Sequence, residues 1–316
     1  MAEAEDKARA IIDRAMSDPA VYQEMARREG EVWGNILPAR DRSEAVEKDH
    51  AASQNLLLGR HQSSLAQVAK ERGFQFEKGV SLGCGAGRLE RSLLAQGVCQ
   101  SLHGIDVSEG AVAEARAIAE RESLPLTYEV ADLNFVQLPP KTYDLVIAQT
   151  SLHHVLFLER VAAQAWQALR ENGLLWIHDF IGETQGQYDP KRLALINELL
   201  AILPEKFRTN TIQKRIVTQA RRPVPGFLGS PFEKIRSEEI IKVFEQWFSI
   251  EWKGEFTGFL DLVAPPGTRG AYVENKDTRA LFEVLLLFDN LCVREGIIKP
   301  VGGQYLMKPR QSPLTD

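Results

Sequence analysis

The chain has few cysteines and no excess of basic residues. Its 316 residues include three cysteines, Cys84, Cys99 and Cys292, too few and too scattered for a disulfide framework or a zinc site. Lys and Arg number 38 against 43 Asp and Glu, which gives a formal net charge of −5. Because a general nucleic-acid binder normally carries a basic balance, we expect no nucleic-acid partner.

Long apolar runs are also missing. No stretch approaches the ~20 apolar residues that a membrane-spanning helix needs. The segment Met-Ala-Glu-Ala-Glu-Asp-Lys at the start is polar and acidic, unlike a secretory signal. With 44% hydrophobic and 26% charged residues, the composition is that of a globular protein, which we expect to be cytoplasmic and without a membrane span.

A glycine-rich turn follows a short apolar run in the first third of the chain. Residues 79–90 read Gly-Val-Ser-Leu-Gly-Cys-Gly-Ala-Gly-Arg-Leu-Glu, and a helical pattern continues from there. Glycine can adopt positive φ and lets the backbone approach a ligand, while a helix beginning near Arg88 offers unpaired N–H groups. The segment therefore predicts a strand, a tight loop and a helix start that together hold a cofactor.

The spacing of the glycines bears on which cofactor this is. The dinucleotide fingerprint needs its third glycine three positions after the second, but that position is Arg88. The pattern of glycines at 83, 85 and 87 instead resembles the first motif of class I S-adenosylmethionine-dependent methyltransferases. Two later features stand in register with it, because Asp106 ends the next apolar run and Asp132 ends the one after.

This resemblance implies a set of cofactor-binding residues at successive strand ends. Asp106 would accept hydrogen bonds from the ribose hydroxyls, and Asp132 would reach the adenine amine. Many members of the superfamily carry an acidic residue two positions before the first glycine, where this chain has Ser81. The residues expected to bind S-adenosylmethionine, or the product S-adenosylhomocysteine, are Ser81, Gly83, Cys84, Gly85, Gly87, Asp106, Val107, Asp132, Leu133 and Gln149. We expect Cys84 to be an unreactive small side chain in a crowded turn.

The alternation of strands and helices predicts an α/β fold. We expect a Rossmann-like, doubly wound and mostly parallel sheet, with a last strand at 303–307 that pairs antiparallel with 248–252. The predicted parts are an N-terminal helical cap (1–75), the cofactor-binding core (76–180), a helical lid inserted after strand five (181–247), and C-terminal strands and a helix that complete the sheet (248–316).

Three residues are predicted to begin helices. Ser108 stands before an apolar pattern from Ala111 onward, and Ser237 stands before another at 240–247. Asp277 precedes a long helix predicted over 278–295, whose apolar face serves core packing or a homodimer contact.

Three histidines follow strands four and five, where this fold presents side chains to the reactive methyl group. A hydroxyl acceptor must lose a proton, and imidazole titrates in the suitable range. We expect His154 to be the base, with His153 and His178 as alternatives. Asp179 could orient an imidazole, although consecutive strand residues such as His178 and Asp179 point to opposite faces.

The resemblance extends over about residues 20–310 to bacterial methyltransferases associated with glycan and natural-product biosynthesis. It rests on segments such as Leu-His-His-Val and Ile-Arg-Ser-Glu-Glu-Ile. It implies a small-molecule or glycan-like acceptor methylated at oxygen, with Asp179, Tyr188 and Arg236 as substrate-binding candidates. Methylation of an amine or peptide nitrogen, and a catalytically inactive scaffold or regulatory subunit, are the alternatives. No carboxylate cluster beyond Asp144 and Asp179 suggests a divalent metal, so none is expected.

Overall fold

A seven-stranded sheet forms the centre of the protein, whose computed structural model describes residues 2–40, 43–57, 63–226 and 229–314. The strand order is β3-β2-β1-β4-β5-β9-β8. The strands are β1 (Phe76–Leu82), β2 (Cys99–Asp106), β3 (Leu126–Val130), β4 (Tyr143–Gln149), β5 (Leu169–Phe180), β8 (Phe248–Phe256) and β9 (Gly302–Pro309). Strands β1 to β5 pair in parallel, and β9 is antiparallel to both β5 and β8. The predicted Rossmann-like sheet with an antiparallel last strand is confirmed.

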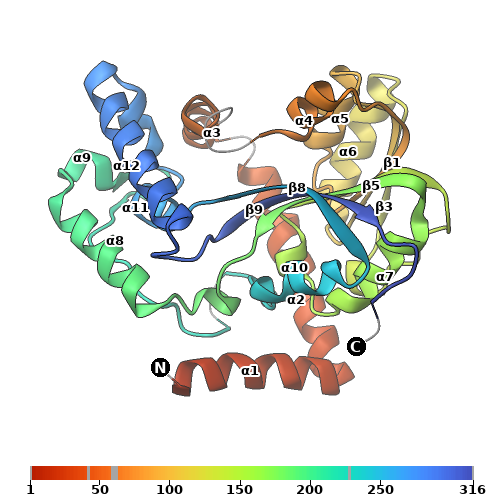
Figure 1. Ribbon diagram of the computed structural model, residues 1–316, viewed down its shortest axis with the longest axis horizontal. Coiled ribbons are helices and arrows are strands. Elements are labelled where there is room, and N and C mark those ends of the chain that lie inside the picture. Colours follow the sequence, from red (N-terminus) through yellow and green to blue (C-terminus); the bar gives the residue numbers. More distant parts are fainter. Residues whose placement is uncertain (1, 41–42, 58–62, 227–228, 315–316) are drawn as a thin grey trace.

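Helices cover both faces of this sheet (Figure 1). On one face lie α4 (Leu65–Arg72), α5 (Arg88–Ala95) and α6 (Glu109–Arg121), which share an apolar core with β1 and β2. On the other lie α7 (Leu158–Ala168) and α10 (Ile240–Glu245), which pack on a second core around β4 and β5. The sheet is therefore buried on both sides, as the apolar runs of its parallel strands require.

Three further helices precede the sheet: α1 (Ala2–Ser17), α2 (Pro19–Arg40) and α3 (Glu44–Leu57). Helix α2 continues through Trp33 and Gly34. Helix α2 packs against α6, and a Cβ atom built on Gly30 would lie 3.7 Å from the carbonyl oxygen of Val107. It therefore passes directly over the loop that follows β2.

The segment between β5 and β8 contains α8 (Pro190–Ile202), α9 (Glu205–Arg208) and the two-stranded ribbon β6 (Thr209–Asn210) and β7 (Arg215–Ile216). Its helix α8 joins α11 (Leu260–Val263) and α12 (Lys276–Arg294) in a separate apolar cluster, seen at the left of Figure 1. Phe232 and Ile235 of the same segment pack with Ala15 and Tyr22 of the N-terminal helices. The segment thus contacts elements far away in the sequence.

Two of the three predicted helix starts are wrong. Ser108 does cap α6, because its hydroxyl accepts a hydrogen bond from the Ala111 N–H. Ser237 instead lies inside the short turn η4 (Ser237–Glu239) and caps nothing. Helix α12 begins earlier than predicted, because Asn275, not Asp277, accepts the first free N–H groups and forms a capping box with Thr278.

The apolar face predicted on α12 packs within the chain. Phe282, Leu285 and Cys292 are buried, whereas Leu287 is 67% exposed. Over the described residues, no helix combines the length and the apolar character needed to cross a bilayer. Residues 1, 41–42 and 58–62 of the predicted cap, 227–228 of the predicted lid, and 315–316 lie outside the described residues. The four-part division of the chain stays a prediction.

Candidate active site

The predicted cofactor residues gather at the carboxyl edge of the parallel strands. They come from the loops after β1, β2, β3 and β4, which parallel pairing brings to the same edge of the sheet. Those that are partly exposed there are Gly83, Gly85, Asp106, Val107, Asp132, Leu133 and Gln149. The edge can therefore hold an extended ligand that touches several strand ends at once.

The glycine loop has the backbone that its sequence predicts. Gly83, Gly85 and Gly87 have φ of 80°, 52° and 73°, values that disfavour any other residue. A Cβ atom on Gly83 would also lie 2.3 Å from the Cβ of Ser151, so the turn after β4 leaves no room for a side chain at this position. The N–H of Gly85 donates to Asp106 at 2.8 Å.

Asp106 organises the next strand end as well. Its second carboxylate oxygen accepts the N–H of Ser108 at 2.9 Å, while burial raises the pKa of the carboxyl group. Ser81, near the end of β1, and Cys84, within the loop, are both buried. Burial raises the pKa of the Cys84 thiol, and the nearby carboxylates of Glu90 and Asp106 raise it further, so the thiol stays protonated.

Asp132 has a partner that the sequence did not indicate. The hydroxyl of Tyr22, on α2, donates to Oδ2 of Asp132 at 2.5 Å, and Asn134 donates to Oδ1 through its backbone and side chain. Tyr22 packs edge-on against Phe135, with ring centroids 5.2 Å apart. Helix α2 therefore closes over the strand end predicted to meet the adenine.

His153 and Asp179 form a buried pair. Nδ1 of His153 lies 2.5 Å from Oδ1 of Asp179, whose other oxygen accepts the backbone N–H groups of Ser151 and Leu152. Burial lowers the pKa of His153, but the adjacent carboxylate outweighs burial, and the net shift is upward. Asp179 thus orients the imidazole and fixes the turn η2 (Leu152–His154) against β5.

His154 is held by a carboxylate from α2. Its Nδ1 lies 2.9 Å from Oε1 of Glu29, and its ring stands edge-on to Trp33 with centroids 5.0 Å apart. Glu29 is 4% exposed; burial raises the pKa of its carboxyl group, but His154 and other donors lower it more, so the carboxylate stays ionised. The sequence shows only that Glu29 and Trp33 share one helix face, and nothing in it relates either residue to His154.

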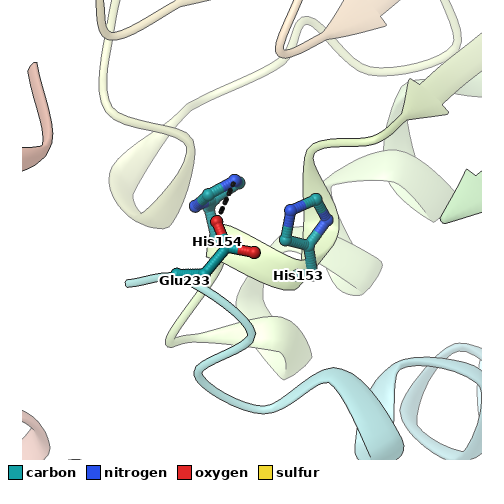
Figure 2. A group of neighbouring side chains, drawn as sticks. All are labelled: His153, His154 and Glu233. Atoms are coloured by element: carbon teal, nitrogen blue, oxygen red, sulfur yellow. Dashed lines mark ion pairs between the residues drawn. The ribbon is translucent and has the colours of Figure 1, made fainter. Parts of the chain in front are cut away.

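The two histidines adjoin a third carboxylate, from Glu233 (Figure 2). Nε2 of His154 lies 3.7 Å from Oε2 of Glu233, and the imidazole centroids of His153 and His154 are 4.1 Å apart. One potential ligand atom from each of the three residues falls within 4.8 Å of the others, so these residue types could also bind a metal ion. Nothing in the sequence relates Glu233 to the two histidines, because it lies about eighty positions downstream.

His178 is not part of this group. It alternates with Asp179 along β5 and points to the other face, where it stands edge-on to Phe256 and lies 3.3 Å from the side-chain amide of Gln304. Burial lowers its pKa to about 4, which keeps the imidazole neutral.

The predicted substrate residues are separated and already engaged. Asp179 is fully used by the turn after β4 and by His153. Tyr188 is buried, and its hydroxyl accepts from Lys234 at 3.3 Å. Arg236 forms ion pairs with Glu159 and Glu239, both at 2.6 Å.

Comparison with known proteins gives one family match. Residues 80–177 match the family model described as "Methyltransferase domain". The ubiquinone biosynthesis O-methyltransferase of Coxiella burnetii is 25% identical over 97 residues, which are 31% of this chain and 41% of that protein. The chain therefore spans about two fifths of the length of the curated relatives it matches.

Solved structures share the fold at low sequence identity. The [4+2]-cyclase SpnF superposes with a TM-score of 0.50 and 14% identity, covering 92% of this chain and 98% of that one. An S-adenosylmethionine-dependent methyltransferase from Mesorhizobium loti gives a TM-score of 0.41 and 18% identity, over 86% and 100% of the two chains. The similarity to the cyclase shows a shared fold alone, so the reaction has to be inferred from the residues of the site.

Proposed function

We propose that this protein, whose residues 80–177 match a methyltransferase domain, is a class I S-adenosylmethionine-dependent methyltransferase that methylates a hydroxyl group of a small-molecule or glycan-like acceptor. One observation carries the proposal: the glycine loop, Asp106 and two carboxylate-backed imidazoles occupy the same edge of the sheet. In the curated relatives the named activity is O-methylation, which supports oxygen as the acceptor atom.

The residues at the carboxyl edge fit the cofactor of this superfamily. The three glycines of the loop have positive φ and no side chains, so a ligand can approach the backbone at these positions. The partly exposed carboxylate of Asp106 accepts two backbone N–H groups and can still accept hydrogen bonds from ribose hydroxyls. Val107, Leu133 and Gln149 complete the expected wall. Bound S-adenosylmethionine supplies a methyl group on a sulfonium, already a good leaving group.

The protein's contribution is alignment and removal of a proton. Orientation of two reactants can account for about 7–11 kcal/mol of a barrier. We assign the proton transfer to His154, because the carboxylates of Glu29 and Glu233, 2.9 Å and 3.7 Å from its Nδ1 and Nε2, orient its imidazole at the cofactor edge. His153, oriented in the same way by Asp179, is the alternative base.

Two segments are proposed to roof the acceptor. Glu29 accepts the N–H of Phe232 at 3.0 Å, so α2 and the segment 181–247 meet directly above His154. The proposal for 181–247 is a lid that orders on ligand binding, which hydrogen exchange with and without S-adenosylhomocysteine would detect. Equal protection in both states would contradict a lid.

Isotope transfer tests the function. We would incubate the protein with methyl-labelled S-adenosylmethionine and panels of phenols, glycosides and amines, and read label transfer by mass spectrometry. Label on a hydroxyl supports the proposal, and label on nitrogen supports the amine alternative. Cofactor binding without transfer to any panel or to cell extract supports the inactive scaffold.

A further inference from the structure

A buried acid that the proposed mechanism does not use lies beneath the glycine loop. Glu90 is in the first turn of α5 and is 0% exposed. Neither of its carboxylate oxygens has a hydrogen-bond partner in the part of the chain that the structure describes. Burying a carboxyl group without partners is costly, so this position calls for an explanation.

The surroundings of Glu90 belong to the cofactor edge. The Ser81 hydroxyl and the Arg91 guanidinium, on β1 and α5, lower the pKa of Glu90, while Asp106 on β2 raises it. Burial is the largest influence and lifts the pKa to about 7. Cys84 in the loop and Tyr128 on β3 also face Glu90, but burial raises the pKa values of both, so neither carries charge near neutral pH.

The sequence offers a reason for an acid here. Ser81 stands where many members of the superfamily carry an acidic residue, two positions before the first glycine. Ser81 is 2% exposed and lies close enough to Glu90 for its hydroxyl to shift the Glu90 pKa. Glu90, on the facing helix, places an acidic side chain in the same buried space as Ser81.

We propose that Glu90 is a positioning residue that is protonated in the free protein and ionised when the cationic cofactor occupies the glycine loop. The proposal rests on S-adenosylmethionine being the ligand of that loop, as the proposed function states. No contact with the reacting atoms is required, because charges interact over several ångströms in a medium of low dielectric constant.

Two consequences follow from charge alone. S-adenosylmethionine carries one more positive charge than S-adenosylhomocysteine, so an ionised Glu90 favours the substrate form of the cofactor over the product form. Because the free protein holds the proton up to about pH 7, binding of S-adenosylmethionine releases it, and affinity weakens by about tenfold between pH 8 and pH 6.

Isothermal titration calorimetry of the wild type and Glu90→Gln tests both consequences. Titrations at pH 7 in buffers of different ionisation enthalpy count the protons released on binding. The wild type should release up to about half a proton more than the variant, which has nothing to ionise. The variant should bind S-adenosylmethionine about tenfold more weakly and S-adenosylhomocysteine within about threefold of wild type. The amino group of the ligand also titrates in this range, but it contributes equally to wild type and Glu90→Gln and so drops out of the difference between them.

Controls separate this proposal from the proposed function. Glu120→Gln, an exposed change on α6, should leave both affinities and the proton count unchanged. Thermal unfolding should show Glu90→Gln to be folded, since the amide removes a buried ionisable group. The role of Glu90 would be overturned if wild type and Glu90→Gln had the same ratio of S-adenosylmethionine affinity to S-adenosylhomocysteine affinity and released the same number of protons. Tight binding with the expected proton release but no methyl transfer would uphold Glu90 while the proposed function fails.

Discussion

Oε1 of Glu29 lies 2.9 Å from Nδ1 of His154, which ties the second helix of the chain to the turn after the fourth strand. The same carboxylate accepts the backbone N–H of Phe232 and the indole N–H of Trp33. Three segments therefore meet on one ionised group. Because a buried carboxylate is stable only with such partners, the position of α2 and the orientation of His154 depend on each other.

The first prediction concerns the base. His154→Ala should lower kcat by about 100- to 10,000-fold and leave S-adenosylhomocysteine affinity nearly unchanged, because only proton transfer is lost. Glu29→Gln, which keeps the shape but not the charge, should give a smaller loss of kcat in the same assay.

Glu31→Gln is the matched control, since Glu31 lies on the exposed side of α2 in a surface pair with Arg27. It should leave kcat unchanged. If His153→Ala or Asp179→Asn lowers kcat by that amount while His154→Ala does not, His153 is the base.

The second prediction concerns the cofactor. Asp106→Ala removes a charged acceptor and should weaken S-adenosylhomocysteine binding by about 1.5–3 kcal/mol in calorimetry. Gly85→Val should abolish binding, because φ of 52° excludes a β-branched residue and the side chain would fill the approach to the loop. Wild-type affinity in both variants would refute the assignment of this edge.

The third prediction separates two reasons why a position requires glycine, namely a positive φ and a lack of space for a Cβ atom. Gly83 and Gly97 both have positive φ, but only Gly83 would bring a Cβ atom against another residue, Ser151. Gly97→Ala should lower the free energy of unfolding by about 1 kcal/mol from backbone strain alone. Gly83→Ala should cost about 3 kcal/mol or more in urea denaturation, since overpacking adds to the strain. Equal losses would contradict the close approach of the two loops.

The fourth prediction follows from the partly buried His178. Burial lowers its pKa to about 4, below the ordinary value of 6.5, so the unfolded chain binds a proton that the folded chain does not. Stability should therefore fall as the pH drops from 6.5 toward 4, by up to about 3 kcal/mol from this group. Other buried groups titrate in the same range, so the measurement is the difference between wild type and His178→Gln. A difference that does not change with pH would show that His178 is not held neutral.

The fifth prediction concerns metal ions. His153, His154 and Glu233 place their potential ligand atoms within 4.8 Å of one another, but the proposed proton transfer uses an imidazole base and needs no metal ion. We therefore expect prolonged dialysis against EDTA to leave kcat unchanged. Loss of activity that Mn²⁺ or Zn²⁺ restores in the wild type but not in Glu233→Gln would assign these three residues to a metal instead.

The parts of the fold that the sequence predicted well have local signals. The glycine loop, the strand end at Asp106, the turn at Asp132 just after β3, and the cap at Ser108 each depend on a few adjacent residues and on the regular spacing of parallel strands. The helix starts at Ser237 and Asp277 were wrong because several nearby residues could cap, and side-chain geometry decided among them.

The missing site residues have no such signal. Tyr22, Glu29 and Glu233 reach the carboxyl edge only through the packing of α2 and of the long segment before β8. Glu90 in the sequence resembles an ordinary acid in the first turn of a helix, where exposure is common. Its burial became visible only when the packing of α5 on the sheet was known.

Strand β9 lies between β5 and β8, although it follows both in the chain. During translation, β8 therefore emerges from the ribosome before the strand that pairs with it, and β5 presents an unpaired edge for just as long. Nascent chains in that state expose two strands able to pair with neighbouring molecules. Slower synthesis downstream of Phe256 should consequently raise the fraction lost to aggregation, and a chaperone that shields β5 until residues 302–309 arrive should recover it.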